Sequence, residues 1–386
     1  MNIKKLCCVL CCFALLPFSV GSSGAVEIID VPESWDDVIQ NVTMQYGQIP
    51  EDYFGGYFLA DDGSLVINVT KEYYESKEFK GCELSSRYVS FHIVEYSIIE
   101  LESMKEALVP YMIEYGIASL DANEMTNTVD VELYYENEDF SNLVKRIPFI
   151  DSNVLRISVL DDGVSFDNAV LYESDILDQT LDEDDLYDIN ATMPELAIYP
   201  GMLLRNVSDD AIFTAGPRSD DQTFFSAGHC ASNGDRITMY YNIPVSPPYS
   251  NHIGSVVYSY FGASGDLCEI AVENLGVMPS GYEFENGHDY SIGYTCIAGE
   301  SVELLGGFSG LVSGEVLRTN VTVSYDGTIV GGLIRTSIRC QRGDSGGGLF
   351  SRNSYSWGSG KAYGVLSGGL FSSGSSVSNE SYFNPI

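Results

Sequence analysis

Short β-rich runs punctuated by glycine and serine fill the chain from Ile198 to its last residue, Ile386. This sequence pattern limits the possible folds more than any other feature of the chain. Helical spacing of apolar residues is nearly absent beyond Ile198, and turn signals recur at the short intervals that separate the strands of barrels and sandwiches. The sequence therefore predicts an all-β domain in the C-terminal half.

Residues 26–176 have a different pattern, typical of an α+β unit. A turn at Asp61-Asp62-Gly63 separates two apolar runs within Tyr53 to Val69, which predicts a hairpin. A second hairpin is predicted over Ile117 to Leu133. Between them, Ser97 to Tyr115 has the three- and four-residue spacing of a helix. Its apolar positions are Ile99, Leu101, Met104, Leu108 and Met112.

Charge also divides the chain in two. Residues 26–195 hold 38 acidic and 8 basic side chains, whereas residues 196–386 hold 17 and 9. Nucleic-acid binding needs clustered lysine and arginine, so we expect no nucleic-acid partner. Residues 177–195 are acidic and have no basic residue, which indicates a solvated linker. Proteolysis concentrates in such segments, and we place maturation between about Asp185 and Pro200.

The first 25 residues have the pattern of a secretory signal. Lys4 and Lys5 precede an apolar run from Leu6 to Val20, and small residues follow up to Ala25. A membrane anchor is the alternative, but this run is shorter than the roughly twenty residues that span a bilayer. We expect cleavage after Ala25, a secreted product, and no membrane attachment afterwards.

One serine stands on a glycine-rich turn, Gly343-Asp344-Ser345-Gly346-Gly347. A serine hydroxyl is a weak nucleophile at neutral pH, and it needs a base and a group that orients the base. Of the four histidines, His229 follows a small-residue turn, Ser226-Ala227-Gly228. Asp266 stands at the start of an alternating apolar run. These residues predict a catalytic trio of His229, Asp266 and Ser345.

The motifs SAGHC, GDLCEIAV and GDSGG occur in this order, and together they resemble the chymotrypsin-like serine proteases. The resemblance is strongest to the secreted streptogrisin and alpha-lytic group, and it covers residues 196–386. It implies two six-stranded β-barrels with the trio in the cleft between them, preceded by an α+β pro-domain over residues 26–176. It also implies that the backbone N–H groups of Gly343 and Ser345 form an oxyanion hole.

The resemblance assigns substrate binding to Ser367, Gly368 and Gly369, whose backbone would pair with an extended peptide. Arg339 and Arg342 flank the expected primary pocket. They could favour an acidic side chain before the scissile bond, or they could both face solvent. No metal and no cofactor are expected.

The chain departs from its relatives in how the serine turn is held. Partner cysteines expected for Cys230 and Cys340 are absent from the sequence, so Cys230, Cys268, Cys296 and Cys340 are either free buried thiols, which we favour, or a new pairing. Asp344 needs a partner if it is buried. The resemblance expects an arginine where this chain has Ile297, which leaves the partner open.

The favoured interpretation is a secreted, monomeric serine endopeptidase that acts on peptides or proteins. It would be made as a precursor whose own pro-region assists folding and blocks the cleft in cis. Two alternatives share the same residues. One is a catalytically silent homologue that only binds a partner, and the other is an esterase on the same scaffold.

Overall fold

The computed structural model describes most of the chain from residue 49 onward. Residues 49–386 form one compact unit. The predicted signal sequence, the acidic linker and most of the predicted maturation region lie outside the described residues. None of the described helices combines the length and the apolar composition that a membrane span requires. The described ranges are 49–76, 79, 89–168, 170–172, 198–240, 252–273, 282–357 and 359–386.

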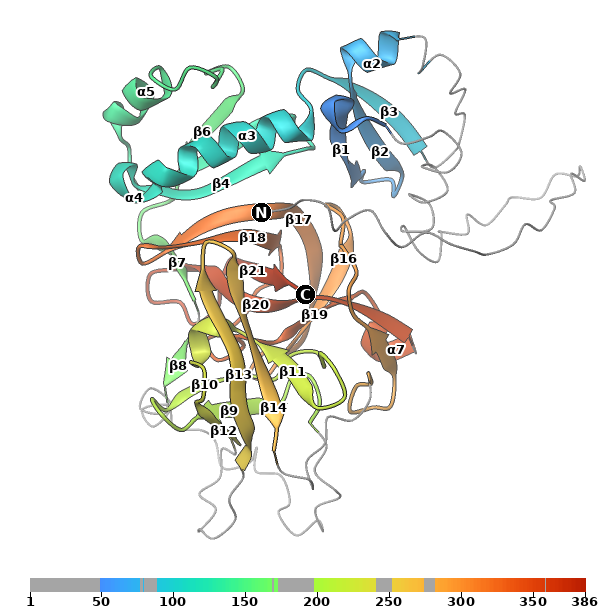
Figure 1. The fold of residues 1–386 in the computed structure, drawn as a ribbon, viewed down its shortest axis with the longest axis vertical. Helices are drawn as coiled ribbons and strands as arrows, with labels where there is room; N and C mark the ends of the chain where they lie inside the picture. The colour runs from blue at the N-terminus through green and yellow to red at the C-terminus, as the bar shows by residue number, and fades with distance from the viewer. Residues whose placement is uncertain are drawn as a thin grey trace, which may run out of the picture. The chain divides into compact units, whose positions relative to one another are not determined.

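The first described elements form a small three-stranded sheet (Figure 1). Strand β1 (Phe54–Leu59) pairs antiparallel with β2 (Leu65–Thr70), which confirms the first predicted hairpin. Strand β3 (Val89–Val94) lies parallel to β2 on its other side. Two short helices flank the strands, η1 (Glu51–Tyr53) and α2 (Lys71–Glu75).

The predicted helix is present but shorter than its apolar spacing suggested. Helix α3 (Ile98–Leu108) begins at a capping box formed by Ser97 and Glu100. Pro110, which has no backbone N–H, interrupts it, and the chain continues as η3 (Val109–Tyr111) and α4 (Met112–Tyr115). Four of the five predicted apolar positions are buried, whereas Ile99 is 41% exposed.

The second predicted hairpin lies beneath α3 in Figure 1. It consists of β4 (Ile117–Asn123) and β5 (Thr128–Leu133), and β6 (Leu155–Val159) runs parallel to β5. Helix α5 (Glu138–Val144) follows the hairpin. The helices and the hairpin bury a common core, which includes Leu101, Leu108, Leu120, Val131 and Phe140.

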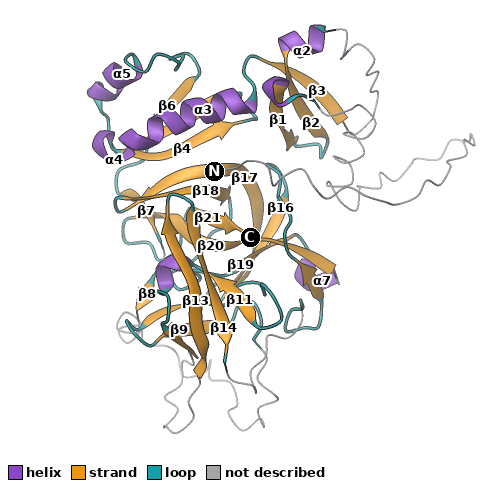
Figure 2. Ribbon diagram, viewed as in Figure 1, coloured by secondary structure: helices purple, strands orange, loops and turns teal. Residues whose placement is uncertain are grey.

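From residue 198 the chain forms two six-stranded antiparallel barrels, as predicted (Figure 2). In the first barrel the strands lie in the order β11-β14-β13-β12-β9-β10. Backbone bonds from Gly216 N to Phe225 O (2.9 Å) and from Phe225 N to Pro217 O (2.8 Å) join its two ends. Its strands are β9 (Leu203–Asn206), β10 (Ala211–Thr214), β11 (Thr223–Ser226), β12 (Arg236–Met239), β13 (His252–Gly262) and β14 (Gly265–Val272).

The second barrel has the order β16-β19-β20-β21-β18-β17, and a further pairing of β16 with β17 closes it. Its interior is apolar, with Val302, Leu304, Ile338 and Leu349 fully buried. Strand β15 (Asp289–Ser291) pairs with β20, and α7 (Ser354–Trp357) precedes that strand. The barrel strands are β16 (Ser301–Gly306), β17 (Gly310–Tyr325), β18 (Thr328–Thr336), β19 (Gly348–Ser351), β20 (Ser359–Ser372) and β21 (Glu380–Pro385).

Three strands from before residue 198 add to the barrel sheets. Strand β4 pairs with β17 through Leu120 and Thr322, so the hairpin extends the sheet of the second barrel. Strand β7 (Val164–Asp167) pairs with β20 of the second barrel. Strand β8 (Leu171–Tyr172) pairs with β10 of the first. The short segment that holds β7 and β8 therefore contacts both barrels.

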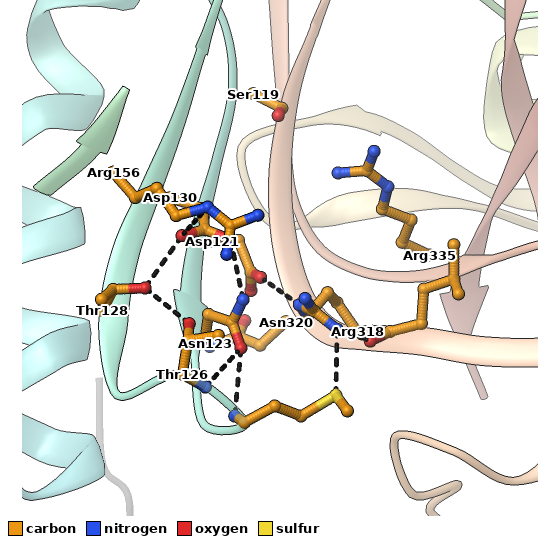
Figure 3. Close-up of polar contacts among 12 residues, drawn as sticks. Ser119, Asp121, Asn123, Thr126, Thr128, Asp130, Arg156, Arg318, Asn320 and Arg335 are labelled. Carbon is orange, nitrogen blue, oxygen red and sulfur yellow. Dashed lines mark hydrogen bonds and ion pairs between the residues drawn. The ribbon is translucent and has the colours of Figure 1, made fainter. Parts of the chain in front are cut away.

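A polar cluster lies where the β4–β5 hairpin meets the second barrel (Figure 3). Arg318 of β17 places Nε 3.1 Å from Oδ2 of Asp121, a carboxylate that is only 2% exposed. Arg335 of β18 contacts Glu132 of the hairpin (3.1 Å) and Glu380 of its own barrel (2.6 Å). The hairpin is thus joined to the barrel by partly buried ion pairs as well as by strand pairing.

Glu124, at the tip of this hairpin, makes stability depend on pH. Burial raises its pKa to about 7, although Arg318 opposes the shift. The folded chain then holds a proton more tightly than the unfolded chain does, so the free energy of unfolding falls by up to about 3 kcal/mol as pH rises from about 4.5 to about 7. We expect Glu124→Gln to remove this part of the pH dependence and to be the more stable variant at pH 8.

Urea unfolding at pH 5 and pH 8 measures this effect, with Ser345→Ala present in every variant to prevent proteolysis. The exposed Glu114→Gln is the matched control, and its pH dependence is expected to follow that of the parent. Parallel pH curves for the parent and for Glu124→Gln would contradict the prediction.

Candidate active site

The structure brings the predicted histidine and aspartate together inside the first barrel. His229 lies in the short helix η5 (Gly228–Cys230) after β11, and Asp266 is the second residue of β14. The backbone N–H of His229 donates to Asp266 Oδ1 (2.9 Å), and His229 Nδ1 lies 2.6 Å from Oδ2. Two contacts at the same carboxylate fix both the main chain and the ring of the histidine.

Asp266 is held from the second barrel as well. Ser367 Oγ donates to its Oδ2 (2.6 Å), and its backbone N–H donates to Asn384 Oδ1 (2.9 Å). The side chains of Asp266 and His229 are 0% and 1% exposed. Because β20 and β21 supply these contacts, the aspartate is oriented by both barrels.

The environment of His229 shifts its proton equilibrium. Burial alone would lower the pKa of the imidazole, but the charge of Asp266, with a smaller contribution from Cys230, outweighs burial and holds the pKa well above its ordinary value. A carboxylate that stabilises the imidazolium makes His229 a stronger base. With Nδ1 bonded to Asp266, Nε2 is the nitrogen that can accept a proton.

The serine turn depends on glycine at two positions. Gly343 and Gly346 have φ values of +90° and +87°, a left-handed conformation that favours glycine. A Cβ on Gly346 would also collide with Ser226 Oγ and Thr214 O. The turn is anchored to the first barrel by Thr214 N, which donates to Ser345 O (2.8 Å), and Ser345 itself is fully buried.

The sequence left the partner of Asp344 open, and the structure shows that its carboxylate accepts hydrogen bonds from a neighbouring turn and from its own turn. The backbone N–H groups of Phe308 and Ser309 donate to Asp344 Oδ1 (2.8 and 3.0 Å), and Gln341 N donates to Oδ2 (2.7 Å). Ser309 Oγ also donates to Oδ2. Four neutral donors therefore satisfy this buried carboxylate. In the relatives that the motifs resemble, an arginine is expected to be its partner.

The nucleophile candidate contacts the chain's own backbone. Ser345 Oγ donates to the carbonyl oxygen of Asn168 (2.8 Å), a residue just after β7. Within the described residues, His229 Nε2 is buried and has no hydrogen-bond partner. Asn168 was not predicted as a site residue, because the sequence around it carries no motif.

The predicted substrate-binding residues differ in how near the structure places them to the predicted trio and to β7. Ser367 contacts Asp266, as described above, and Gly369 pairs with Asp167 of β7. Arg342 forms an ion pair with the same Asp167. Arg339 is exposed, and its Nε donates to Ser378 O (3.1 Å), so the structure does not bring it to the trio.

The four cysteines after residue 198 are buried and carry free thiols. No cluster of three or more histidine, cysteine, aspartate or glutamate side chains in the described ranges is arranged to hold a metal ion.

Comparison with known proteins supports the resemblance seen in the motifs. The chain is 43% identical over 72 residues to serine protease 2 of Streptomyces fradiae. This matched segment is 18% of this chain and 37% of that protein. It is 37% identical over 82 residues to streptogrisin-A of Streptomyces griseus, and this segment is 21% of this chain and 25% of that protein. No family model matches the chain.

Among solved structures, the Cellulomonas bogoriensis chymotrypsin is 23% identical, with a TM-score of 0.39 over 50% of this chain and 92% of that one. Alpha-lytic protease homologue N4 is 22% identical, with a TM-score of 0.38 over 49% and 93%. The matched segments span between 20% and 37% of the length of these curated relatives. The predicted resemblance to chymotrypsin-like serine proteases is confirmed.

Proposed function

We propose that this chain, whose C-terminal part has the chymotrypsin-like fold, is the precursor of a secreted serine endopeptidase. In this proposal residues 1–25 are a signal sequence, residues 26–176 a pro-region, residues 177–195 a linker and residues 196–386 the protease domain. The observation that carries the activity is the buried contact of His229 with Asp266, 2.6 Å from Nδ1 to Oδ2.

In the proposed reaction each member of the trio has one role. His229 Nε2 takes the proton of Ser345 Oγ as the oxygen attacks a peptide carbonyl, and it later returns that proton to the leaving amine. Asp266 keeps Nδ1 protonated and stabilises the charge that His229 acquires. The backbone N–H groups of Gly343 and Ser345 stabilise the oxyanion, and losing one such donor typically costs about 3 to 4 kcal/mol.

The pro-region blocks this site in the proposed precursor. Strand β7 occupies the edge of β20 at Gly369, where a peptide substrate would pair. An extended peptide in this groove favours an endopeptidase over an esterase, because an ester substrate needs no strand pairing. The intact trio and the glycines of the serine turn argue against a silent homologue.

Asp266→Asn tests the proposal, with hydrolysis of a denatured protein as the measurement. An amide in place of the carboxylate loses the acceptor for His229 Nδ1–H, so we expect kcat to fall by about four orders of magnitude. Asp289→Asn is the matched control, because Asp289 is an exposed aspartate of β15. Full activity of Asp266→Asn would refute the assigned role.

A further inference from the structure

Asn384 of β21 joins the second barrel to the main chain of the candidate active site in the first. Its Oδ1 accepts a hydrogen bond from the backbone N–H of Asp266 (2.9 Å), the second residue of β14. Both residues are buried, with Asn384 7% and Asp266 0% exposed. They are 118 positions apart in the sequence, so the bond depends on the folding of both barrels.

A second hydrogen bond sets the orientation of the Asn384 amide. Its Nδ2 donates to the carbonyl oxygen of Pro385 (2.8 Å), which leaves Oδ1 as the atom that faces Asp266. With the amide reversed, Nδ2 would face the N–H of Asp266, and two donors would meet. The side chain therefore has one orientation in which both of these bonds form.

Two glycines leave the space that Asn384 occupies. A Cβ on Gly265, the residue before Asp266, would lie 2.2 Å from Asn384 Oδ1. A Cβ on Gly364 of β20 would lie 2.5 Å from the carbonyl oxygen of Asn384. Gly265 also has a φ of +131°, which favours glycine. A side chain at either glycine would have to displace Asn384 from its place against β14.

The main chain at Asp266 determines where its carboxylate lies, because the side chain is short. Oδ1 accepts from the backbone N–H of His229 (2.9 Å), and Oδ2 lies 2.6 Å from His229 Nδ1 and accepts from Ser367 (2.6 Å). Without Asn384 the buried N–H of Asp266 would lose its acceptor, which is unfavourable, and the start of β14 would shift toward another one. Such a shift would move the carboxylate away from His229.

We infer that Asn384 is a positioning residue of the active site, which acts through the main chain of Asp266 to keep its carboxylate on His229. The bond lies one step from the reacting atoms, so its effect is on the geometry of the histidine–aspartate pair. The alignment of β21 with β14, and hence of the two barrels, becomes a condition for activity. This inference rests on the proposed endopeptidase function.

Two variants of nearly equal size separate the hydrogen bond from packing. Asn384→Leu keeps the volume of the side chain but has no acceptor, whereas Asn384→Asp keeps an acceptor oxygen. We expect kcat on a peptide substrate to fall about a hundredfold in Asn384→Leu, with KM changed less than about threefold, and to stay within about tenfold of wild type in Asn384→Asp. Asn379→Leu is the matched control, because Asn379 is exposed just before β21, and wild-type kcat is expected.

The pH dependence of kcat/KM separates positioning from a general loss of stability. Burial lowers the pKa of His229, but the charge of Asp266 outweighs burial and holds that pKa above its ordinary value. A displaced carboxylate would stabilise the imidazolium less. The apparent pKa of the acidic limb should therefore be lower in Asn384→Leu than in wild type. A fold loosened elsewhere would reduce the amount of active enzyme and leave this pKa unchanged.

All variants are produced as the full chain, and active sites are counted by fluorophosphonate titration, so that kcat refers to folded enzyme. Asn384→Ala, which removes the acceptor without adding an apolar side chain, is the second variant should Asn384→Leu fold poorly, and the same changes are expected. Wild-type kcat and pH profile in the variants without an acceptor would overturn the inference, as would equal losses in Asn384→Leu and Asn384→Asp. A wild-type chain that neither reacts with the titrant nor cuts any peptide would overturn the proposed function as well.

Discussion

Replacing Ser345 with alanine is expected to abolish hydrolysis of a denatured protein, with kcat lower by about six orders of magnitude. The fully buried Ser345 supplies the only hydroxyl on the Gly343–Gly347 turn, and without it His229 has no nucleophile to activate. Fragments are quantified by gel electrophoresis and mass spectrometry over a long incubation. Because Ser345 is small and alanine fits its space, the variant should fold normally.

Ser313→Ala is the matched control for this prediction. Ser313 is exposed in β17 of the same barrel, and its Oγ lies 3.5 Å from Glu303. We expect this variant to retain wild-type activity. Proteolysis by Ser345→Ala above the level of a mock preparation would show that another residue is the nucleophile.

A chain that begins at residue 196 is expected to refold poorly and to show no measurable activity. It lacks β4, which extends the second barrel beside Thr322, and it lacks β7 and β8, which cover β20 and β10. Phe166 is also lost, and it packs within a core cluster that includes Tyr325, Leu333 and Tyr382. Removing these contacts exposes apolar surface and unpaired strand edges.

The measurement is refolding from urea, followed by circular dichroism and by activity on a denatured protein. The full-length chain, refolded in parallel, is the reference. Residues 26–176 added as a separate polypeptide should increase the yield of active enzyme. Rapid refolding of residues 196–386 to full activity, without that addition, would contradict a folding role for the pro-region.

Local sequence patterns predicted most of the fold because the interactions behind them are local. Two hairpins and one helix were evident from turn residues and from apolar spacing, and only the end of the helix was misplaced. Pro110 interrupts it after Leu108, although the apolar spacing continues to Met112. The all-β class of the C-terminal half followed from short β-rich runs, and the two barrels followed from the family resemblance that the motifs carry.

The contact of His229 with Asp266 was also predictable, since each stands within a distinctive motif, whereas the role of Ser345 stays a prediction. The partners of Asp344 were not predictable, because three of its four donors are backbone N–H groups, which any residue type except proline would supply. The contact of Asn168 with Ser345 could not be predicted from the sequence for another reason. Strands β7 and β8 have four and two residues, and tertiary pairing rather than local propensity sets where they lie.

Covalent labelling of the processed chain by a fluorophosphonate tests the central claim, that Ser345 is an activated nucleophile, most directly. The reagent phosphonylates a serine hydroxyl only when a base has activated it, and peptide mapping by mass spectrometry locates the adduct. The account predicts one adduct, on Ser345, which is absent from Ser345→Ala and strongly reduced in His229→Ala. An adduct on another residue, or no adduct on a processed chain that still degrades protein, would contradict it.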